Sequence, residues 1–292
     1  MIDSDLGVLY VNGRRCEIQE PSISALDRGF TLGDGVFETM RARGENILRL
    51  GQHLERLSRG ASLFKIPFPS QKELTTALEQ VLSEKLEVEL VLRLTLTRGV
   101  DFGRGVVLPS RSVPTLAIRA TSYRPPSKSV YRKGFCAAIS SVRRNENSPL
   151  SSVKSCNYAN SILARLEVES LGAQEAILLN QQEQVVCAST ANLFLFKDGI
   201  LYTPAEKAGA LSGITRSCIL ECTGPLGITT SLSSFGVNEL REIDEAFLCN
   251  TVLGVMPLTK LEAHPVGSGR PGFLTQELSQ AFETLIDKEL KV

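Results

Sequence analysis

The chain has 292 residues, 42% of them hydrophobic and 22% charged, which is typical of a globular protein with a sizeable core. Its 32 Lys and Arg residues match its 32 Asp and Glu residues, so the charge balance predicts no general attraction to nucleic acid or to an anionic membrane. It contains no run of 18 apolar residues, and acids stand near the N-terminus where a signal peptide carries bases. We therefore expect a cytoplasmic protein without a membrane span.

In the N-terminal half, residues 8–18 predict a β-hairpin, because VLYVNGRRCEI carries Asn-Gly at its tip. Apolar residues recur at helical spacing over 50–64. A Ser-x-x-Glu capping box begins a second helix, which we expect over 70–82. Residues 87–97 alternate between apolar and polar side chains and predict a strand.

The C-terminal half alternates between short strands and helices. A helix is expected over 157–171, ending at Gly172. Another helix should begin in the segment SGIT, with Ser212 as its N-cap. The remaining predicted elements are strands over 176–179, 193–196 and 245–250 and a final amphipathic helix over 274–290.

A Pro-Pro pair and several Ser and Lys residues lie between these halves and predict an interdomain linker. The expected organisation is a small N-terminal domain (1–121), the linker (122–134) and a larger C-terminal domain (135–292). The pattern of elements predicts an α/β or α+β fold in two domains.

The cysteines and histidines argue against a metal centre. The seven cysteines form no CxxC pair, and His53 and His264 are the only histidines. We therefore expect neither a metal site nor a disulfide framework.

Several polar residues could carry chemistry, although each also has an ordinary structural interpretation. Lys154 stands between small polar residues before a helix, where an amine could meet a cofactor aldehyde. The helix start in LSGITR exposes backbone amides suited to a phosphate, and Arg56 in HLERL could contribute a bidentate contact. Arg98 and Arg104 flank a glycine-containing loop and could bind substrate carboxylates. Taken singly, Lys154 and each of the three arginines could equally be solvated surface residues.

Taken together, the motifs resemble those of the class-IV aminotransferases, a family that includes branched-chain aminotransferases, D-amino acid aminotransferases and aminodeoxychorismate lyases. The resemblance runs nearly end to end, with the motifs in the family's order. They are DRGFTLGDGVFETMR (27–41), HLERL (53–57), TRG (97–99), VKSCNYANSILARLE (153–167), ANLFLFKDGILYTP (191–204), LSGITR (211–216) and LCNTVLGVMPL (248–258).

The resemblance implies a fold-type IV enzyme with pyridoxal 5'-phosphate as its cofactor. The family lysine matches Lys154, which would form a Schiff base with the cofactor and then move the substrate α-proton. Arg56, the amides of Ile214 and Thr215 and the hydroxyl of Thr251 would bind the cofactor phosphate.

Further roles follow from the same resemblance. Tyr158 would hydrogen-bond the ring oxygen of the cofactor, and Phe30 and Phe37 would line the substrate pocket. Arg98 and Arg104 would bind the substrate, with Arg98 ranked first because TRG matches both transaminase and lyase patterns. Family members are homodimers that hold the cofactor between the two domains, so we expect a homodimer.

The sequence departs from the family at one position. A glutamate normally stands five residues before the Asn of the ANLF motif and binds the protonated pyridine nitrogen. Here that position is Cys187, and Glu183, four residues earlier, falls in an expected turn. A thiol is a poor partner for a pyridinium, so the cofactor should be a weaker electron sink.

Three functions remain open at this point. The TRGVDFGRG loop and the late strand favour an aminodeoxychorismate lyase, which forms 4-aminobenzoate and pyruvate for folate synthesis. A D-amino acid or branched-chain transaminase is the alternative, and the spacing from Lys154 to Asn157 fits lyases and D-amino acid enzymes alike. A non-catalytic homologue is disfavoured, because the lysine and the phosphate-binding motifs are present.

Overall fold

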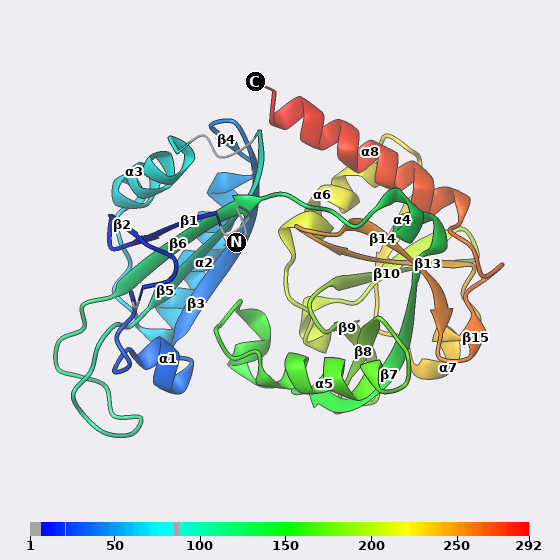
Figure 1. Ribbon diagram of the computed structural model, residues 1–292. Helices are drawn as coiled ribbons and strands as arrows, with labels where there is room; N and C mark the ends of the chain where they lie inside the picture. Colours follow the sequence, from blue (N-terminus) through cyan, green and yellow to red (C-terminus); the bar gives the residue numbers. More distant parts are fainter. Residues whose placement is uncertain (1–6, 21, 85–87, 292) are drawn as a thin grey trace. The chain divides into compact units, whose positions relative to one another are not determined.

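The computed structural model describes residues 7–20, 22–84 and 88–291 (Figure 1). The chain divides into two compact units. Unit 1 comprises Met1–Arg124, Val153–Asn157 and Glu289–Val292, and unit 2 comprises Pro125–Ser152 and Tyr158–Lys288. The division falls inside the segment expected as a linker, and the segment that carries Lys154 belongs to unit 1.

Unit 1 is built on a six-stranded antiparallel sheet with the strand order β2-β1-β6-β5-β3-β4. Helices α2 and α3 share one hydrophobic core with the sheet, in which Leu57 and Leu78 from the helices pack with Leu92 from β5. The elements are β1 (Val8–Val11), β2 (Arg14–Cys16), α1 (Arg28–Leu32), β3 (Gly35–Arg43), β4 (Asn46–Ile47), α2 (Leu50–Phe64), α3 (Gln71–Leu82), β5 (Glu89–Thr97) and β6 (Thr115–Ser122).

The two faces of this sheet differ in character, because successive side chains of a strand point to opposite faces. In β5, Leu92 and Leu94 are fully buried on the helix-covered face, whereas Arg93 between them is exposed on the other. We call this other face, which carries the odd-numbered residues of β3 and β5, the open face.

The local predictions for unit 1 agree closely with the structure. Helix α2 has the predicted bounds. Helix α3 begins one residue after its predicted start, because Ser70 is its N-cap, and Ser70 and Glu73 form the predicted capping box. The predicted hairpin is β1 and β2. The predicted strand began at Glu87, which lies outside the described residues; β5 begins at Glu89.

Unit 2 is built on a mixed nine-stranded sheet with the order β12-β11-β10-β13-β14-β7-β8-β9, in which β15 pairs with β14. Phe194 and Phe247 stack in its core, with ring centroids 4.8 Å apart. The strands are β7 (Phe135–Arg144), β8 (Glu175–Asn180), β9 (Val185–Ala188), β10 (Asn192–Lys197), β11 (Ile200–Thr203), β12 (Thr229–Leu232), β13 (Glu245–Asn250), β14 (Gly254–Leu261) and β15 (His264–Pro265). The α-helices are α4 (Lys128–Lys133), α5 (Ala159–Glu169), α6 (Ile214–Thr223), α7 (Val237–Leu240) and α8 (Phe273–Glu289).

In unit 2, β13 has the predicted bounds and α8 is displaced from its predicted range by one residue. The predicted N-cap of α6 was wrong: the cap is Gly213, not Ser212. The backbone of Gly213 is still extended, with ψ of 135°. A Cβ at this position would lie 1.9 Å from Oδ1 of Asn192, so any larger residue would force the Asn192 side chain to move. Within the described residues, no helix is long and apolar enough to cross a membrane.

Candidate active site

Lys154 lies in a short extended segment that pairs with the beginning of β3. The Phe37 amide donates to the Lys154 carbonyl at 2.9 Å, and the Cys156 amide donates to the Gly35 carbonyl at 2.8 Å. These bonds surround an antiparallel bridge between Val36 and Ser155. The backbone of β3 therefore fixes the position of the half-buried lysine.

The lysine side chain lies against an aromatic ring. Its Nζ atom is 4.4 Å from the centroid of the Phe37 ring, and the guanidinium carbon of Arg93 is 3.7 Å from the same centroid. Both distances are within the range of cation–π attraction. Phe37 is 3% exposed, so the ring is a fixed support for the two cations. The sequence motifs did not identify Arg93.

A buried carboxylate, Glu38, organises the residues on the other side of β3. Its two oxygens accept hydrogen bonds from Nε and Nη2 of Arg56, at 2.8 and 2.6 Å, and Oε2 lies 2.7 Å from Nδ1 of His53. Burial would raise the pKa of Glu38, but Arg56 and His53 outweigh it and hold the pKa below its usual value. Burial lowers the pKa of His53, against the attraction of Glu38. The cluster orients Arg56, whose role as a phosphate ligand stays a prediction.

Arg98 is buried in a second ionic cluster. Its guanidinium donates to Asp34 at 2.7 and 3.1 Å and to the carbonyls of Phe64 and Lys65 at 2.5 and 3.0 Å. Asp34 also accepts from Arg28 at 2.8 Å, and the two arginines hold its pKa below the usual value although burial would raise it. These bonds give Arg98 a structural function, and a substrate contact of Arg98 or Arg104 stays a prediction.

Arg104 and Phe30 are both exposed. Arg104 lies in the long loop between β5 and β6, and Phe30, on α1, is 75% exposed. Arg28 anchors the loop by donating to Asp101 at 3.0 Å and to the carbonyls of Gly105 and Val107 at 3.3 Å. Within unit 1, Phe37 therefore lies next to Lys154, while Phe30 belongs to the exposed surface.

In unit 2, the beginning of α6 has the properties of an anion site. Its cap, Gly213, provides no side-chain hydrogen bond to the amides of the first turn, which begins with Ile214 and Thr215. The Asn192 side chain donates to the Leu211 carbonyl at 2.9 Å and holds the preceding segment. Such amides and the helix dipole attract a phosphate.

Two further predicted cofactor residues of unit 2 are partly buried. Thr251 begins the turn after β13, which Asn250 shapes by accepting from the amides of Val252 and Leu253 at 2.9 and 2.7 Å. Tyr158 is the N-cap residue of α5.

Cys187 lies in β9, opposite Leu178 of β8, and is 6% exposed. Its neighbours in the hydrophobic cluster include Ala138, Ala164 and Ala210. Burial raises the pKa of the thiol. The charge of Arg144 opposes this shift and that of Glu175 adds to it, so the thiol is neutral.

Glu183, the other acid near this position in the sequence, lies in the turn before β9 and has a φ of 58°. Its carboxylate forms an exposed ion pair with Arg143 at 2.7 Å. The expected turn is therefore present, and the Glu183 carboxylate is paired with Arg143.

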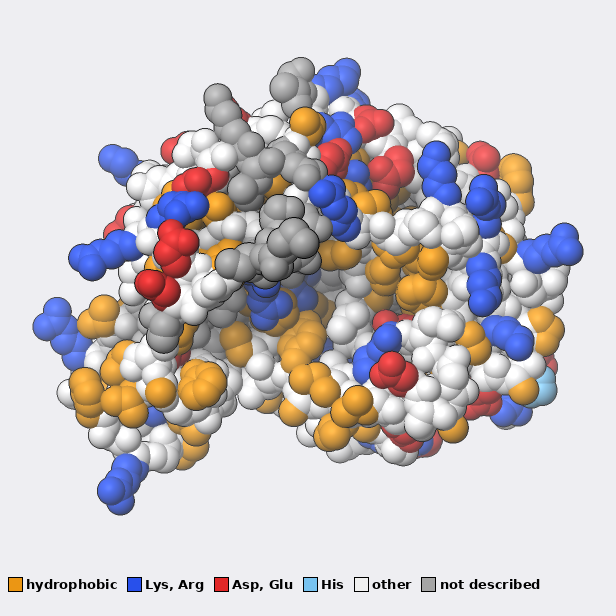
Figure 2. Space-filling view, in the orientation of Figure 1, with side chains coloured by type: hydrophobic (Ala, Val, Ile, Leu, Met, Phe, Trp, Pro, Cys, Tyr) orange, Lys and Arg blue, Asp and Glu red, His pale blue; other side chains and the backbone are white. Residues whose placement is uncertain are grey.

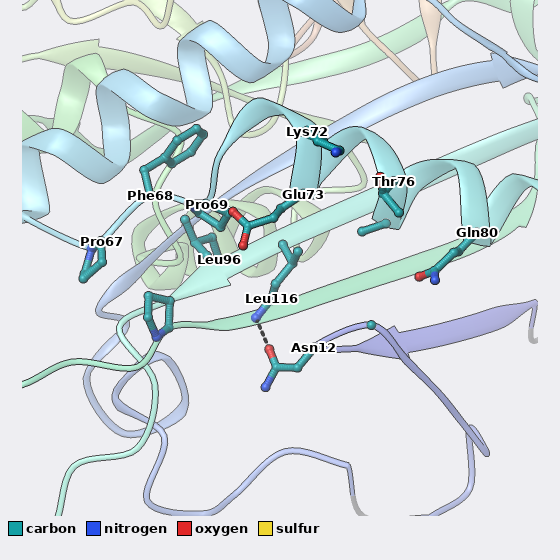
Figure 3. Close-up of a pocket in the computed structure, with 13 residues that line it drawn as sticks. Asn12, Pro67, Phe68, Pro69, Lys72, Glu73, Thr76, Gln80, Leu96 and Leu116 are labelled. Carbon is teal, nitrogen blue, oxygen red and sulfur yellow. Dashed lines mark hydrogen bonds between the residues drawn. The ribbon is translucent and has the colours of Figure 1, made fainter.

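A separate hollow of about 650 Å³ lies on unit 1 beside α3 (Figure 3). Its walls include Phe68 and Lys72, and the Asn12 side chain accepts from the Leu116 amide at 2.8 Å at its edge. None of the site residues predicted from the sequence is among the described residues that line it.

Comparison with known proteins identifies the family. Residues 35–261 match the model of the class-IV aminotransferases, and the chain belongs to this family. It is 31% identical to a D-alanine aminotransferase of Listeria monocytogenes over 94% of each chain. It is 30% identical to an aminodeoxychorismate lyase of Bacillus subtilis, over 97% of this chain and 95% of that one. The branched-chain amino acid aminotransferase of Escherichia coli superposes with a TM-score of 0.91 and 27% identity, over 98% and 96% of the two chains.

Class-IV aminotransferases use pyridoxal phosphate, so the chain is a pyridoxal-phosphate-dependent enzyme with a fold-type IV architecture. Most of the residues present fit the cofactor. Unit 1 offers a positioned amine at Lys154, and unit 2 offers uncapped amides at the beginning of α6. The exception is Cys187, because a neutral thiol in an apolar cluster does not fit a protonated ring nitrogen.

Proposed function

We propose that this enzyme catalyses the reaction of an aminodeoxychorismate lyase, which forms 4-aminobenzoate and pyruvate from 4-amino-4-deoxychorismate. The observation that carries the proposal is the neutral, buried thiol of Cys187 at the position where the family normally has a glutamate. In this elimination the electrons of the broken C–H bond expel the enolpyruvyl oxygen from the neighbouring carbon. The reaction therefore depends less on the pyridine ring as an electron sink than a transamination does.

The proposed roles of the individual residues follow from the family motifs and their surroundings. Pyridoxal phosphate supplies an aldehyde and an electron-withdrawing ring. Lys154 provides the amine that binds the aldehyde, and it then removes the proton from the substrate carbon that bears the amine. Arg56, held in orientation by Glu38, and the amides of Ile214 and Thr215 bind the phosphate.

Further residues have secondary roles in this proposal. Thr251 adds a hydroxyl to the phosphate site, and Tyr158 hydrogen-bonds the ring oxygen. Arg104 binds a substrate carboxylate, since Arg98 is committed to Asp34.

An amino-acid transaminase is the second candidate. Relatives named D-alanine aminotransferase and aminodeoxychorismate lyase match the chain at 31% and 30% identity, which does not separate the two activities. The difference would then lie in the substrate-binding residues rather than in the fold.

We also propose that the enzyme is a homodimer. The loop between β5 and β6 exposes apolar side chains, with Phe102 at 87%, Val106 at 82% and Val107 at 76% exposure. Figure 2 shows hydrophobic side chains gathered in the region where Figure 1 draws this loop. An exposed apolar group of this kind is typical of a protein–protein interface.

The test of the proposed activity is a direct comparison of two assays on the purified holoenzyme. One measures pyruvate and 4-aminobenzoate formed from 4-amino-4-deoxychorismate, and the other measures amino transfer from a panel of D- and L-amino acids to 2-oxo acids. We expect stoichiometric formation of both lyase products and slow amino transfer. Rapid amino transfer without pyruvate release would establish the transaminase instead.

A further inference from the structure

Arg216, the third residue of α6, is an arginine buried inside unit 2. The residue is 5% exposed. Its Nε donates to the hydroxyl of Thr203 at 3.1 Å, and its Nη2 donates to the carbonyl of Pro204 at 3.0 Å. Both partners are neutral, so these bonds hold the guanidinium in place without cancelling its charge.

Among the described residues, no carboxylate forms an ion pair with Arg216. Burial lowers the pKa of its guanidinium, while the exposed Glu206 and the buried Cys249 oppose this shift only in part. An arginine stays protonated in a protein, so the shift indicates a poorly compensated charge rather than a neutral side chain. Such a buried charge costs free energy unless an anion lies nearby.

The place of Arg216 in its helix adds to this cost. Helix side chains lean toward the N-terminus, so a side chain at the third position is directed back toward the first turn. The amides of this turn form the positive end of the helix dipole, where a cation is unfavourable and an anion is stabilised. A bound anion would therefore offset both the burial of the guanidinium and its repulsion from the dipole.

The bonds of Arg216 also attach the first turn of α6 to the sheet. Its partner Thr203 ends β11 and donates to the Leu193 carbonyl of β10 at 2.9 Å. The preceding residue of β10, Asn192, donates to the Leu211 carbonyl before α6 at 2.9 Å. In the sequence, the first two amides of α6 lie between these two attachments, which therefore fix their positions.

We propose that Arg216 is a positioning residue of the phosphate site. It holds the first turn of α6 against β11 and β10, and its buried charge adds positive potential to the amides that bind a phosphate dianion. The cost of burying the guanidinium is offset when the dianion is bound, so phosphate should stabilise the protein. This inference rests on the proposed role of the Ile214 and Thr215 amides, and it gives Arg216 no contact with the cofactor.

The test compares two ligands of the full-length chain without cofactor, pyridoxal phosphate and pyridoxal, which differ by the phosphate. The dissociation constant of pyridoxal divided by that of pyridoxal phosphate measures the contribution of the phosphate site. We expect Arg216→Met, which keeps an unbranched side chain and removes its charge, to lower this ratio about tenfold. The binding of pyridoxal itself should stay the same.

Thermal unfolding with inorganic phosphate distinguishes this role from a purely structural one. Saturating phosphate should raise the melting temperature of the wild type, and the rise should be much smaller in Arg216→Met. A structural role alone would lower the melting temperature equally with and without phosphate and leave the ratio intact, which would overturn the proposal. If the methionine variant does not fold, Arg216→Gln decides in the same way, because it removes the charge but keeps an amide donor.

The matched control is Arg144→Met. Arg144 also donates to two backbone carbonyls, those of Gly209 and Ser151, but it lies at the end of β7 and not at the beginning of a helix. This variant should lose stability and keep the ratio, and a fall as large as that in Arg216→Met would contradict the proposal. The readouts are binding and stability, so an enzyme with the expected ratios that releases no pyruvate contradicts the proposed lyase reaction and not the role of Arg216.

Discussion

The site residues of unit 1 are supported by a buried carboxylate, whereas position 187 of unit 2 carries a neutral thiol. In unit 1, Glu38 is fully buried but is bound by Arg56 and His53, and Asp34 is bound by two arginines. In unit 2, Cys187 lies in an apolar cluster and stays neutral, while the buried carboxylate nearby belongs to Glu175, which accepts from the Ser189 hydroxyl. The comparison shows that buried charge is kept in this chain where it fixes the position of another side chain. Position 187, which was expected to support the ring nitrogen of the cofactor, carries no charge.

Replacement of the lysine should have the largest effect. We expect Lys154→Ala to abolish both the absorption band of the bound cofactor and turnover, because the amine beside Phe37 is then removed. Absorption spectra of the purified variant test this, with Lys207→Ala as a control at an exposed lysine. A variant that retained the band would remove Lys154 from its proposed role.

Replacing each of the two arginines of the β5–β6 loop should affect a different property, the stability of the fold for Arg98 and the KM for Arg104. Arg98→Ala leaves Asp34 partly unpaired in a buried cluster and should destabilise the fold by about 3–5 kcal/mol. Arg104→Ala changes an exposed side chain and should leave stability within about 0.5 kcal/mol while raising KM. Urea unfolding and steady-state kinetics of both variants measure the contrast. The reverse pattern would restore Arg98 as the substrate ligand.

The buried cluster around Glu38 should make stability depend on pH. His53 has a lowered pKa, so its contribution is complete above its usual value of 6.5 and is lost as the pH falls below it. Glu38 also has a lowered pKa, and its contribution is lost as the pH falls below about 4.5 and through the folded-state pKa. We expect the free energy of unfolding to decline from pH 7 to 5, and to decline further at lower pH.

Urea unfolding across this pH range measures the effect. His53→Gln should flatten the upper part of the profile, where the slope of one such group is at most about 1.4 kcal/mol per pH unit. An unchanged slope between pH 7 and 5 in that variant would assign the dependence to other groups.

A carboxylate at position 187 should have the smallest but most informative effect. We expect Cys187→Glu to raise the rate of amino transfer about tenfold, equivalent to about 1.4 kcal/mol in the activation barrier. The control is Cys187→Gln, because glutamine has the size of glutamate without its charge, and this variant should give no gain in rate. Both variants should lose stability, because the cluster around Cys187 is apolar. Equal rates in the wild type and the glutamate variant would show that the thiol does not limit the cofactor.

Helices were predictable from the sequence where the spacing of apolar residues or a capping box marked their bounds. The bounds of α2 followed from apolar spacing, and those of α3 from its capping box. The N-cap of α6 was not predictable, because it depends on Asn192, which is remote in the sequence and whose side chain fills the space next to Gly213. Caps set by a tertiary contact leave no local signal.

The candidate site was predictable only as a set of motif positions. Lys154, Arg56 and Cys187 were identified by order and spacing, but the partners that fix Arg56 and Arg98 were not. Glu38 and Asp34 lie inside recognised motifs without any sign of what they bind. Arg93 was missed because its meaning depends on strand register, which brings it next to Phe37 and Arg119.

The most direct measurement of the central claim is to reduce the holoenzyme with borohydride, digest it and locate the modified lysine by mass spectrometry. Reduction fixes the cofactor to the amine that holds it. The account predicts that the phosphopyridoxyl group is attached to Lys154 and that the peptide carrying Lys207 is unmodified. Modification at any other lysine, or no modification of an enzyme that absorbs as a pyridoxal-phosphate protein, would contradict it.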